Sequence, residues 1–227
     1  MKQNKYYLVP EGDLFRVVYL QDIYDCDDHI IARAGERGGL VENEKNLSQK
    51  GYCVVLGNAR VLDNSRVCDD AIVMHNAFVC KGSVVSGRAK VLDNSVVSNN
   101  TIISYHALIK DNAIVTDGSI VIDDAIVQDR ANIVNSYIMY WGRVSGNAIV
   151  DSKSKVKGGA RVTDNARIIG SKVRGDSLVG GKANLTNCNI WNAKVTQGDL
   201  YGRFVFAKSA LNEANDEAEF NEEDLDK

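Results

Sequence analysis

The chain has 227 residues, of which 44% are hydrophobic and 25% are charged, and its formal net charge is -3. This balance excludes an intrinsically disordered chain and fits one folded domain or an elongated repeat array. No run of about 18 apolar residues could span a bilayer, and the first residues lack the apolar core of a secretory signal. Five cysteines without a CxxC pair indicate free thiols rather than disulfides or a zinc knuckle. We therefore expect a cytoplasmic protein that contacts no membrane and holds no metal or other cofactor.

Residues 1–53 come before the repeat described below and have a different character. They contain an apolar run at residues 14–20 and a glycine-rich stretch at residues 34–42. The ends of a stack of strands expose unpaired backbone groups and must be covered. We expect residues 14–53 to cap the first coil of the region that follows.

An aliphatic residue recurs at every sixth position from residue 61 to residue 133, and a small residue stands two positions before each. A period of six fits neither an α-helix nor a meander of hairpins. Residues two apart point to the same side of a strand, and the Asn, Asp or Gly before the small residue supplies a corner. The pattern predicts short strands joined at corners, three to a triangular coil. The aliphatic positions are Val61, Val67, Val73, Val79, Val85, Val91, Val97, Ile103, Ile109, Val115, Val121, Val127 and Ile133.

The unit Val61-Leu62-Asp63-Asn64-Ser65-Arg66 resembles the hexapeptide repeat of left-handed parallel β-helix proteins, and the resemblance covers residues 55–200. Residues 34–42 (AGERGGLVE), followed by residues 46–51 (NLSQKG) and by Asn58-Ala59, are similar to the first segment of YdcK-like proteins of bacteria and their phages. This likeness implies a β-helical fold and a phage or prophage setting. It implies no reaction, because we know of none assigned to that family.

The fold class predicted is all-β: a left-handed parallel β-helix of about eight triangular coils. An N-terminal cap over residues 1–53 is followed by the β-helix over residues 54–206 and by an acidic tail, disordered or helical, over residues 207–227. After residue 133 the spacing slips, and we place Met139 and then Val144 as the next inward residues. Tyr201, Phe204, Val205 and Phe206 are expected to cap the last coil.

The residue before each inward aliphatic points outward, and in the middle coils many of these residues are apolar. One side reads Val84, Ile102, Ile120 and Ile138, a second Phe78, Val96 and Ile114, and a third Ile72, Leu108 and Ile126. Exposed apolar columns mark an interface, although β-branched residues also simply suit strands. We predict a side-by-side homo-oligomer, and the family resemblance implies a trimer. The interface candidates are Phe78, Val84, Val96, Ile102, Leu108, Ile114, Ile120 and Ile126.

The outward register turns basic toward the C-terminus. Residues 142–208 carry 12 Lys and Arg against 4 Asp and Glu, whereas residues 213–226 carry 8 Asp and Glu and no Lys or Arg. Four residues are predicted to form one column in which two aromatic rings bracket two cations, an arrangement that can stack a base and pair a phosphate. The alternative is a solvated face whose aromatics contact a cap or a neighbouring subunit. The predicted column is Tyr140, Lys157, Arg174 and Trp191, with Arg143, Lys155, Arg161, Arg167, Lys172 and Lys194 as further cations.

Catalysis is the least favoured function. Acyltransferases with this repeat use a histidine base beside a cleft, but His29 precedes the repeat, and His75 and His106 fall on different sides without an acidic or thiol partner at a triad spacing. No loop interrupts residues 61–133, and no glycine-rich phosphate loop is present. We expect a non-enzymatic scaffold that acts on a host or defence protein. The alternatives are a binder of nucleic acid or a nucleotide through the basic half, and an acyltransferase.

Overall fold

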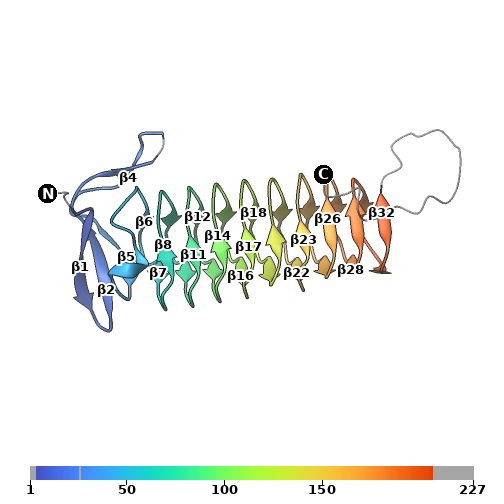
Figure 1. Ribbon diagram of the computed structural model, residues 1–227, viewed down its shortest axis with the longest axis horizontal. Coiled ribbons are helices and arrows are strands. Elements are labelled where there is room, and N and C mark those ends of the chain that lie inside the picture. Colours follow the sequence, from blue (N-terminus) through green and yellow to red (C-terminus); the bar gives the residue numbers. More distant parts are fainter. Residues whose placement is uncertain (1–3, 26, 207–227) are drawn as a thin grey trace, which may run out of the picture.

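A computed structural model describes residues 4–25 and 27–206. Over these residues the chain is all-β and winds into an elongated stack of coils, with a short strand of each coil on each of three faces (Figure 1). Strands on one face pair in parallel with those one coil away, as Phe78 does with Val96. The predicted all-β parallel solenoid is confirmed. No helix in the described ranges is long and apolar enough to cross a bilayer.

The strands group into three long sheets, which we call faces 1, 2 and 3. Face 1 contains β1 (Tyr6–Glu11), β2 (Leu14–Tyr19), β5 (Arg37–Val41), β7 (Arg60–Val61), β10 (Phe78–Val79), β13 (Val96–Val97), β16 (Ile114–Thr116), β19 (Asn132–Val134), β22 (Ile149–Asp151), β25 (Arg167–Ile169), β28 (Asn184–Thr186) and β31 (Asp199–Tyr201). Face 2 contains β8 (Arg66–Val67), β11 (Val84–Val85), β14 (Ile102–Ile103), β17 (Ile120–Val121), β20 (Tyr137–Ile138), β23 (Lys155–Val156), β26 (Lys172–Arg174), β29 (Asn189–Trp191) and β32 (Phe204–Phe206). Face 3 contains β6 (Val54–Val55), β9 (Ile72–Val73), β12 (Lys90–Val91), β15 (Leu108–Ile109), β18 (Ile126–Val127), β21 (Arg143–Val144), β24 (Arg161–Val162), β27 (Leu178–Val179) and β30 (Lys194–Val195).

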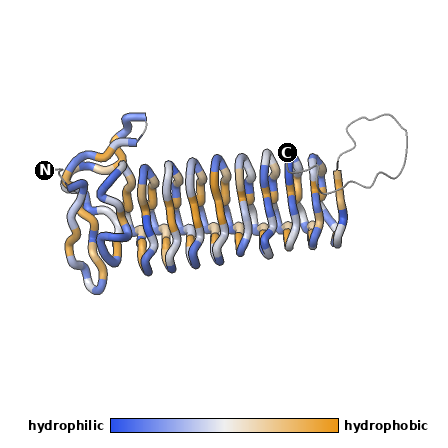
Figure 2. The backbone as a smooth tube through the Cα atoms, in the orientation of Figure 1, coloured by the Kyte–Doolittle hydropathy of each residue, from blue (hydrophilic) through white to orange (hydrophobic). Residues whose placement is uncertain are grey.

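The interior is a continuous aliphatic column, as the six-residue period predicts. The second residue of nearly every short strand is fully buried, for example Ile103 and Val162. Apolar and polar residues alternate along each coil (Figure 2). At the corner between faces 1 and 2 the small inward residue is mostly Ser or Thr, and its hydroxyl bonds backbone: Ser83 Oγ donates to Cys80 O at 2.9 Å and accepts from the N–H of Thr101 at 3.3 Å. These inward hydroxyls are thus satisfied by the coils themselves.

The corners use left-handed backbone, as predicted. Asp63 (φ 52°) and Asn64 (φ 59°) form one such corner, and Asp, Asn and Gly fill most of the others. These residues tolerate positive φ because glycine has no Cβ and the short Asp and Asn side chains bond locally. Most corners therefore turn without strain, although Tyr105 and Tyr140 are bulky residues that also adopt positive φ.

The stack has about nine coils, where the sequence predicted eight. The additional coil lies at the start. Val41 of β5 already pairs in parallel with Val61, and Leu47 forms a parallel bridge to Val67. The next inward residue, Val55, stands eight positions after Leu47, so the six-residue count misses this coil.

The N-terminal cap, which in the structure comprises the described residues before β5, extends face 1. The hairpin of β1 and β2 adds two antiparallel strands to the outer side of β5, and β3 (Ile23–Tyr24) with β4 (Ile30–Ala32) forms a separate hairpin. η1 (Glu44–Asn46) is a single 3-10 turn. Tyr6 donates to Leu47 O at 2.5 Å and Tyr19 to Val55 O at 3.0 Å, which joins the cap to the first coil. Burial raises the pKa of both phenols well above their usual range.

A buried lysine also joins the cap to the first coil. Lys5 Nζ donates to Cys53 O at 2.7 Å and lies 3.1 Å from Cys53 Sγ, and both residues are buried. Desolvation lowers the pKa of Lys5 and raises that of Cys53, so each group is pushed toward its neutral form.

The first slip of the repeat lies one strand earlier than predicted. Ile138 is fully buried in the inward column, and Met139 is half-buried and follows it. Our assignment of Met139 as inward and Ile138 as outward is therefore wrong. The corner between faces 1 and 2 has one left-handed residue here, Asn135, where earlier coils have two. The step from Ile133 to the next inward residue is consequently five.

The last coil is not closed in the way we predicted. Tyr201, Phe204 and Phe206 are each at least 60% exposed, because they are the outward residues of β31 and β32. Leu200 and Val205 are the inward ones and pack against the core. The expectation that the three aromatics cover the end is wrong. The predicted acidic tail lies outside the described residues.

Candidate functional site

Carboxylates in the coils are concentrated at the corners. Among residues 54–206 only Asp151 and Asp199 lie within strands, both on face 1. Several corner carboxylates accept a backbone N–H from the next coil: Asp129 from Gly146 at 2.8 Å and Asp164 from Gly181 at 2.7 Å. The second bond lowers the pKa of Asp164. These acids stabilise the stacking of coils, and the strands of faces 2 and 3 carry no negative side chains.

Face 2 gathers four of the predicted cations on two neighbouring coils. Lys155 pairs with Lys172 across β23 and β26, and the backbone N–H of Lys157 donates to Val173 O, so Lys157 lies beside Arg174. We call these four residues the basic array. No Asp or Glu occurs in any strand of face 2.

The cations of the basic array have no acidic partner in the part of the chain that the structure describes. Lys155 Nζ lies 5.8 Å from the centre of the Tyr137 ring, and Arg174 donates to Asn189 Oδ1 at 2.7 Å. The Nε of Arg174 is buried and has no hydrogen-bond partner. Like charges stacked at strand spacing repel one another, so this surface favours an anion.

The predicted four-residue column is correct in three of its four members. Arg174 pairs directly with Trp191, and Lys157 precedes them in the same column. Tyr140 is the error, because the earlier slip places Met139 beside Lys157. Tyr140 instead turns the next corner with φ 59°.

Aromatic side chains nevertheless border the basic array at both ends. At the corner between faces 2 and 3, Tyr140 and Trp141 are more than half exposed. At the matching positions the next coil carries Gly158 and Gly159, and the coil after it carries Gly175 and Asp176. A Cβ placed on Gly175 would lie 2.9 Å from Cδ1 of Trp191, so the indole lies against that glycine. Sequence reasoning missed Trp141. With the slip placed before Ile138, Trp141 falls beside Tyr140 at the corner between faces 2 and 3.

The remaining predicted cations are spread over the other faces. Arg143 pairs with Arg161 on face 3. Lys194 lies further along the same face, and Arg167 is the one predicted cation on face 1. Among the predicted cations, all of which lie in the described residues, only the basic array brings four together.

The predicted apolar columns occupy three separate faces. Val84, Ile102 and Ile120 lie on face 2, Phe78, Val96 and Ile114 on face 1, and Leu108 with Ile126 on face 3. Ile102 and Ile114 are the most exposed, at 41% and 42%. Ile72, which we expected to be outward and free, is only 6% exposed and belongs to the buried cluster. A contact between two copies would cover one or two faces, not all three columns.

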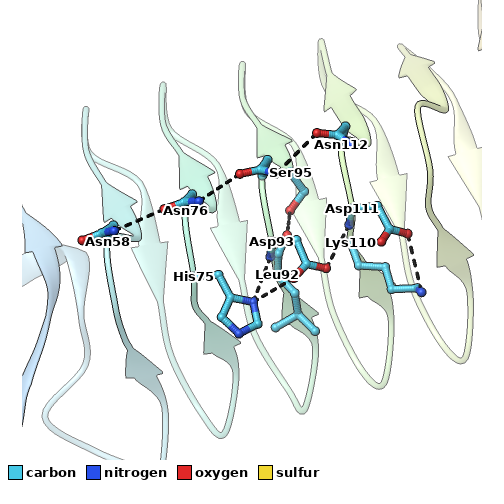
Figure 3. Close-up of polar contacts among 10 residues, drawn as sticks. Asn58, His75, Asn76, Leu92, Asp93, Ser95, Lys110, Asp111 and Asn112 are labelled. Carbon is cyan, nitrogen blue, oxygen red and sulfur yellow. Dashed lines mark hydrogen bonds and ion pairs between the residues drawn. The ribbon is translucent and has the colours of Figure 1, made fainter.

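Two histidines have acidic partners, contrary to the sequence prediction. His75 Nδ1 lies 2.8 Å from Asp93 Oδ1, and His106 Nδ1 lies 3.5 Å from Asp124 Oδ1. Each partner is 18 residues away, which is one coil, so spacing by coils rather than by triads identifies it. Figure 3 shows His75 and Asp93 beside a ladder of asparagine amides that runs from Asn58 to Asn112.

One group in the N-terminal cap has the residue types of a cation site. The ligand atoms of Asp25, Asp27 and His29 lie within 4.8 Å of one another. Asp25 Oδ1 accepts the backbone N–H of Asp27 and of His29, both at 2.9 Å. The carboxylate is therefore already used in closing a turn, which explains the cluster without an ion.

No protein-family model matches this chain, and no curated protein matches its sequence.

Proposed function

We propose that this protein is a non-enzymatic binding scaffold whose basic array on face 2 binds a polyanion, such as single-stranded nucleic acid. The observation that carries the proposal is the set of four cations in β23, in the residue after it and in β26. They have no acidic partner in the described chain, and the strands of their face contain no carboxylate. Phosphate contacts supply most of the affinity of nonspecific nucleic-acid binding.

The rigidity of the coil supports this function. Adjacent strands lie about 4.8 Å apart, so the cations form a fixed lattice and need little ordering when a ligand binds. Trp191 at one end and Tyr137 at the other offer flat rings for stacking, which tolerates any base. Stacking and phosphate contacts together favour a single strand over a duplex, whose bases are not accessible to rings.

The test uses charge reversal on the array and a matched reversal elsewhere. The double variant Lys155→Glu, Lys172→Glu removes two stacked cations from face 2. The control Lys81→Glu, Lys90→Glu makes the same charge change in the first half of the stack. Affinity for a labelled oligothymidylate of about 20 nucleotides is measured by anisotropy across a salt series.

We expect the array variant to bind at least about tenfold more weakly and its log–log salt slope to fall by about 1.4, because each of the two lysines that no longer neutralises a phosphate lowers the slope by about 0.7. The control should bind less than about threefold more weakly, through the change in net charge alone. Equal weakening in both variants would contradict the proposal.

A second function, side-by-side self-association, is favoured by the exposed apolar residues of the first half. Ile102 lies between the half-buried Val84 and Ile120, and Ile114 lies beside the half-buried Val96. Patches of this kind support a homo-oligomer, and a trimer follows from the hexapeptide-repeat resemblance.

The finer placement of the chain rests on sequence likeness. Residues 34–42 and 46–51 support a place near the YdcK-like proteins, and with it a hexapeptide repeat, a phage or prophage setting and a host partner. The cytoplasmic location rests on the free-thiol composition. Expression of a tagged chain and fractionation of the cells would test the location.

A further inference from the structure

We infer that the acidic segment of residues 213–226 docks on the basic array of its own chain and competes there with the polyanion. This inference rests on the proposed function for its consequence, but the docking itself can be measured without a ligand. It identifies the occupant of face 2 in the free protein as a part of the same molecule.

The path of the chain leads to the array. β32 ends at Phe206, which pairs with Trp191 on face 2, and Trp191 pairs in turn with Arg174. The chain therefore leaves the coil from the column that contains Arg174 and Lys157. Phe206 and the basic array thus lie on the same face.

The length of the chain is sufficient. Three strand spacings of about 4.8 Å separate Phe206 from Lys157, or about 14 Å. Six residues, 207–212, precede the first acid of the segment and span up to about 20 Å when extended. Glu213 can thus reach the array, and the remaining acids can follow it along face 2.

The charges are complementary and otherwise unused. The segment has eight carboxylates and no Lys or Arg, whereas the coils' own aspartates are mostly held at corners. A tether of this length gives an effective concentration on the order of millimolar. Each exposed pair contributes little, so the contact depends on several pairs, weakens with salt and can be displaced by a longer polyanion.

The first experiment measures docking in the full chain with a zero-length carbodiimide, which joins a carboxylate to an amine in direct contact. We expect mass spectrometry to find residues 213–226 joined to Lys155, Lys157 or Lys172, with a yield that does not change on tenfold dilution. Joining mainly to Lys81, Lys90 or Lys110, or no joining, would overturn the inference. The variant Lys155→Glu, Lys172→Glu is the control, and its yield should fall at least about threefold.

The second experiment measures competition. A full-chain variant in which all eight acids of residues 213–226 become the matching amides should bind oligothymidylate about tenfold more tightly at 50 mM salt, with the gain shrinking as salt rises. Equal affinity of the two proteins would overturn the inference while leaving the proposed function intact. Absence of binding by both would instead refute the proposed function, and the cross-linking result alone would then decide the docking.

Discussion

The coils of residues 60–127 and those of residues 137–206 have the same interior and different exteriors. Inward residues are buried aliphatics in both halves, as Ile109 and Val162 illustrate. Outward, the first half shows mainly aliphatic columns such as Val84 and Ile102, whereas the second shows Lys155 and Lys172 in the same column of face 2. The inward positions and corners therefore specify the fold, and the outward positions are free to carry function.

The corners differ between the halves as well. In the first half each corner between faces 1 and 2 has two left-handed residues, such as Asp117 and Gly118. In the second half that corner often has one, at Asn135, Gly170 and Asn187. Each shortened corner shifts which residue faces outward by one position, so the second half presents a mixed surface that a fixed period cannot align.

The largest expected effect, on the free energy of unfolding, comes from a substitution in the shared interior where the two halves meet. Ile138→Ala leaves a cavity in the inward column and should lower the free energy of unfolding by about 2–5 kcal/mol. Met139→Ala, one residue later, removes a half-buried side chain and should cost less than about 1 kcal/mol. Urea unfolding followed by circular dichroism compares the two. A larger effect at Met139 would mean that the coil follows the register we first predicted.

The sequence predicted the fold well because the period-six pattern records interior packing directly. Burial of Val61 through Ile133 in one column followed from spacing alone, as did the left-handed corners. Three features could not be predicted in the same way. The first coil is hidden by a longer loop before Val55, the slip at Asn135 moved Tyr140 out of its column, and the partners of His75 and His106 lie one coil away rather than nearby in sequence.

Separate exteriors should give separable functions, and reciprocal substitutions sharpen this point. Ile102→Lys places a charge in the aliphatic column of face 2 and should reduce the assembled mass toward the 24.9 kDa of one chain while polyanion affinity stays within about threefold. The array variant Lys155→Glu, Lys172→Glu should keep the assembled mass and bind the polyanion at least about tenfold more weakly.

Light scattering after gel filtration gives the mass of each protein. Comparing Ile102→Lys with Ile114→Lys shows whether face 2 or face 1 forms the contact. A wild-type protein that has the mass of one chain at micromolar concentration would refute self-association.

Substitution of His75, a histidine of the first half that has an acidic partner, tests whether that half is catalytic. His75 is oriented by Asp93, which is one part of a general-base arrangement. We expect no acyl-CoA turnover by the wild-type protein, and His75→Ala should change stability by less than about 0.5 kcal/mol because the pair is exposed. Turnover that His75→Ala abolishes, and that His106→Ala leaves intact, would restore the acyltransferase function.

The smallest effect concerns a corner of the second half that lies on the same edge of the prism as His75. The N–H of Gly181, helped by the hydroxyl of Thr163, lowers the pKa of Asp164 below its unfolded value near 3.8. The folded state is thus stabilised by the ionised carboxylate above about pH 4, and this contribution is lost as the pH falls through the lowered pKa.

Asp164→Asn should leave the urea midpoint at pH 7 nearly unchanged and make its decline between pH 5 and about pH 2 shallower. Thr163→Val keeps the Gly181 bond, so the decline of its urea midpoint should be intermediate between those of wild type and Asp164→Asn. If the urea midpoint of Asp164→Asn declines as steeply as that of wild type, the corner carboxylate does not stabilise the stacking of coils through its charge. Acidic corners and basic faces would then differ in where their charges lie and not in what those charges do for stability.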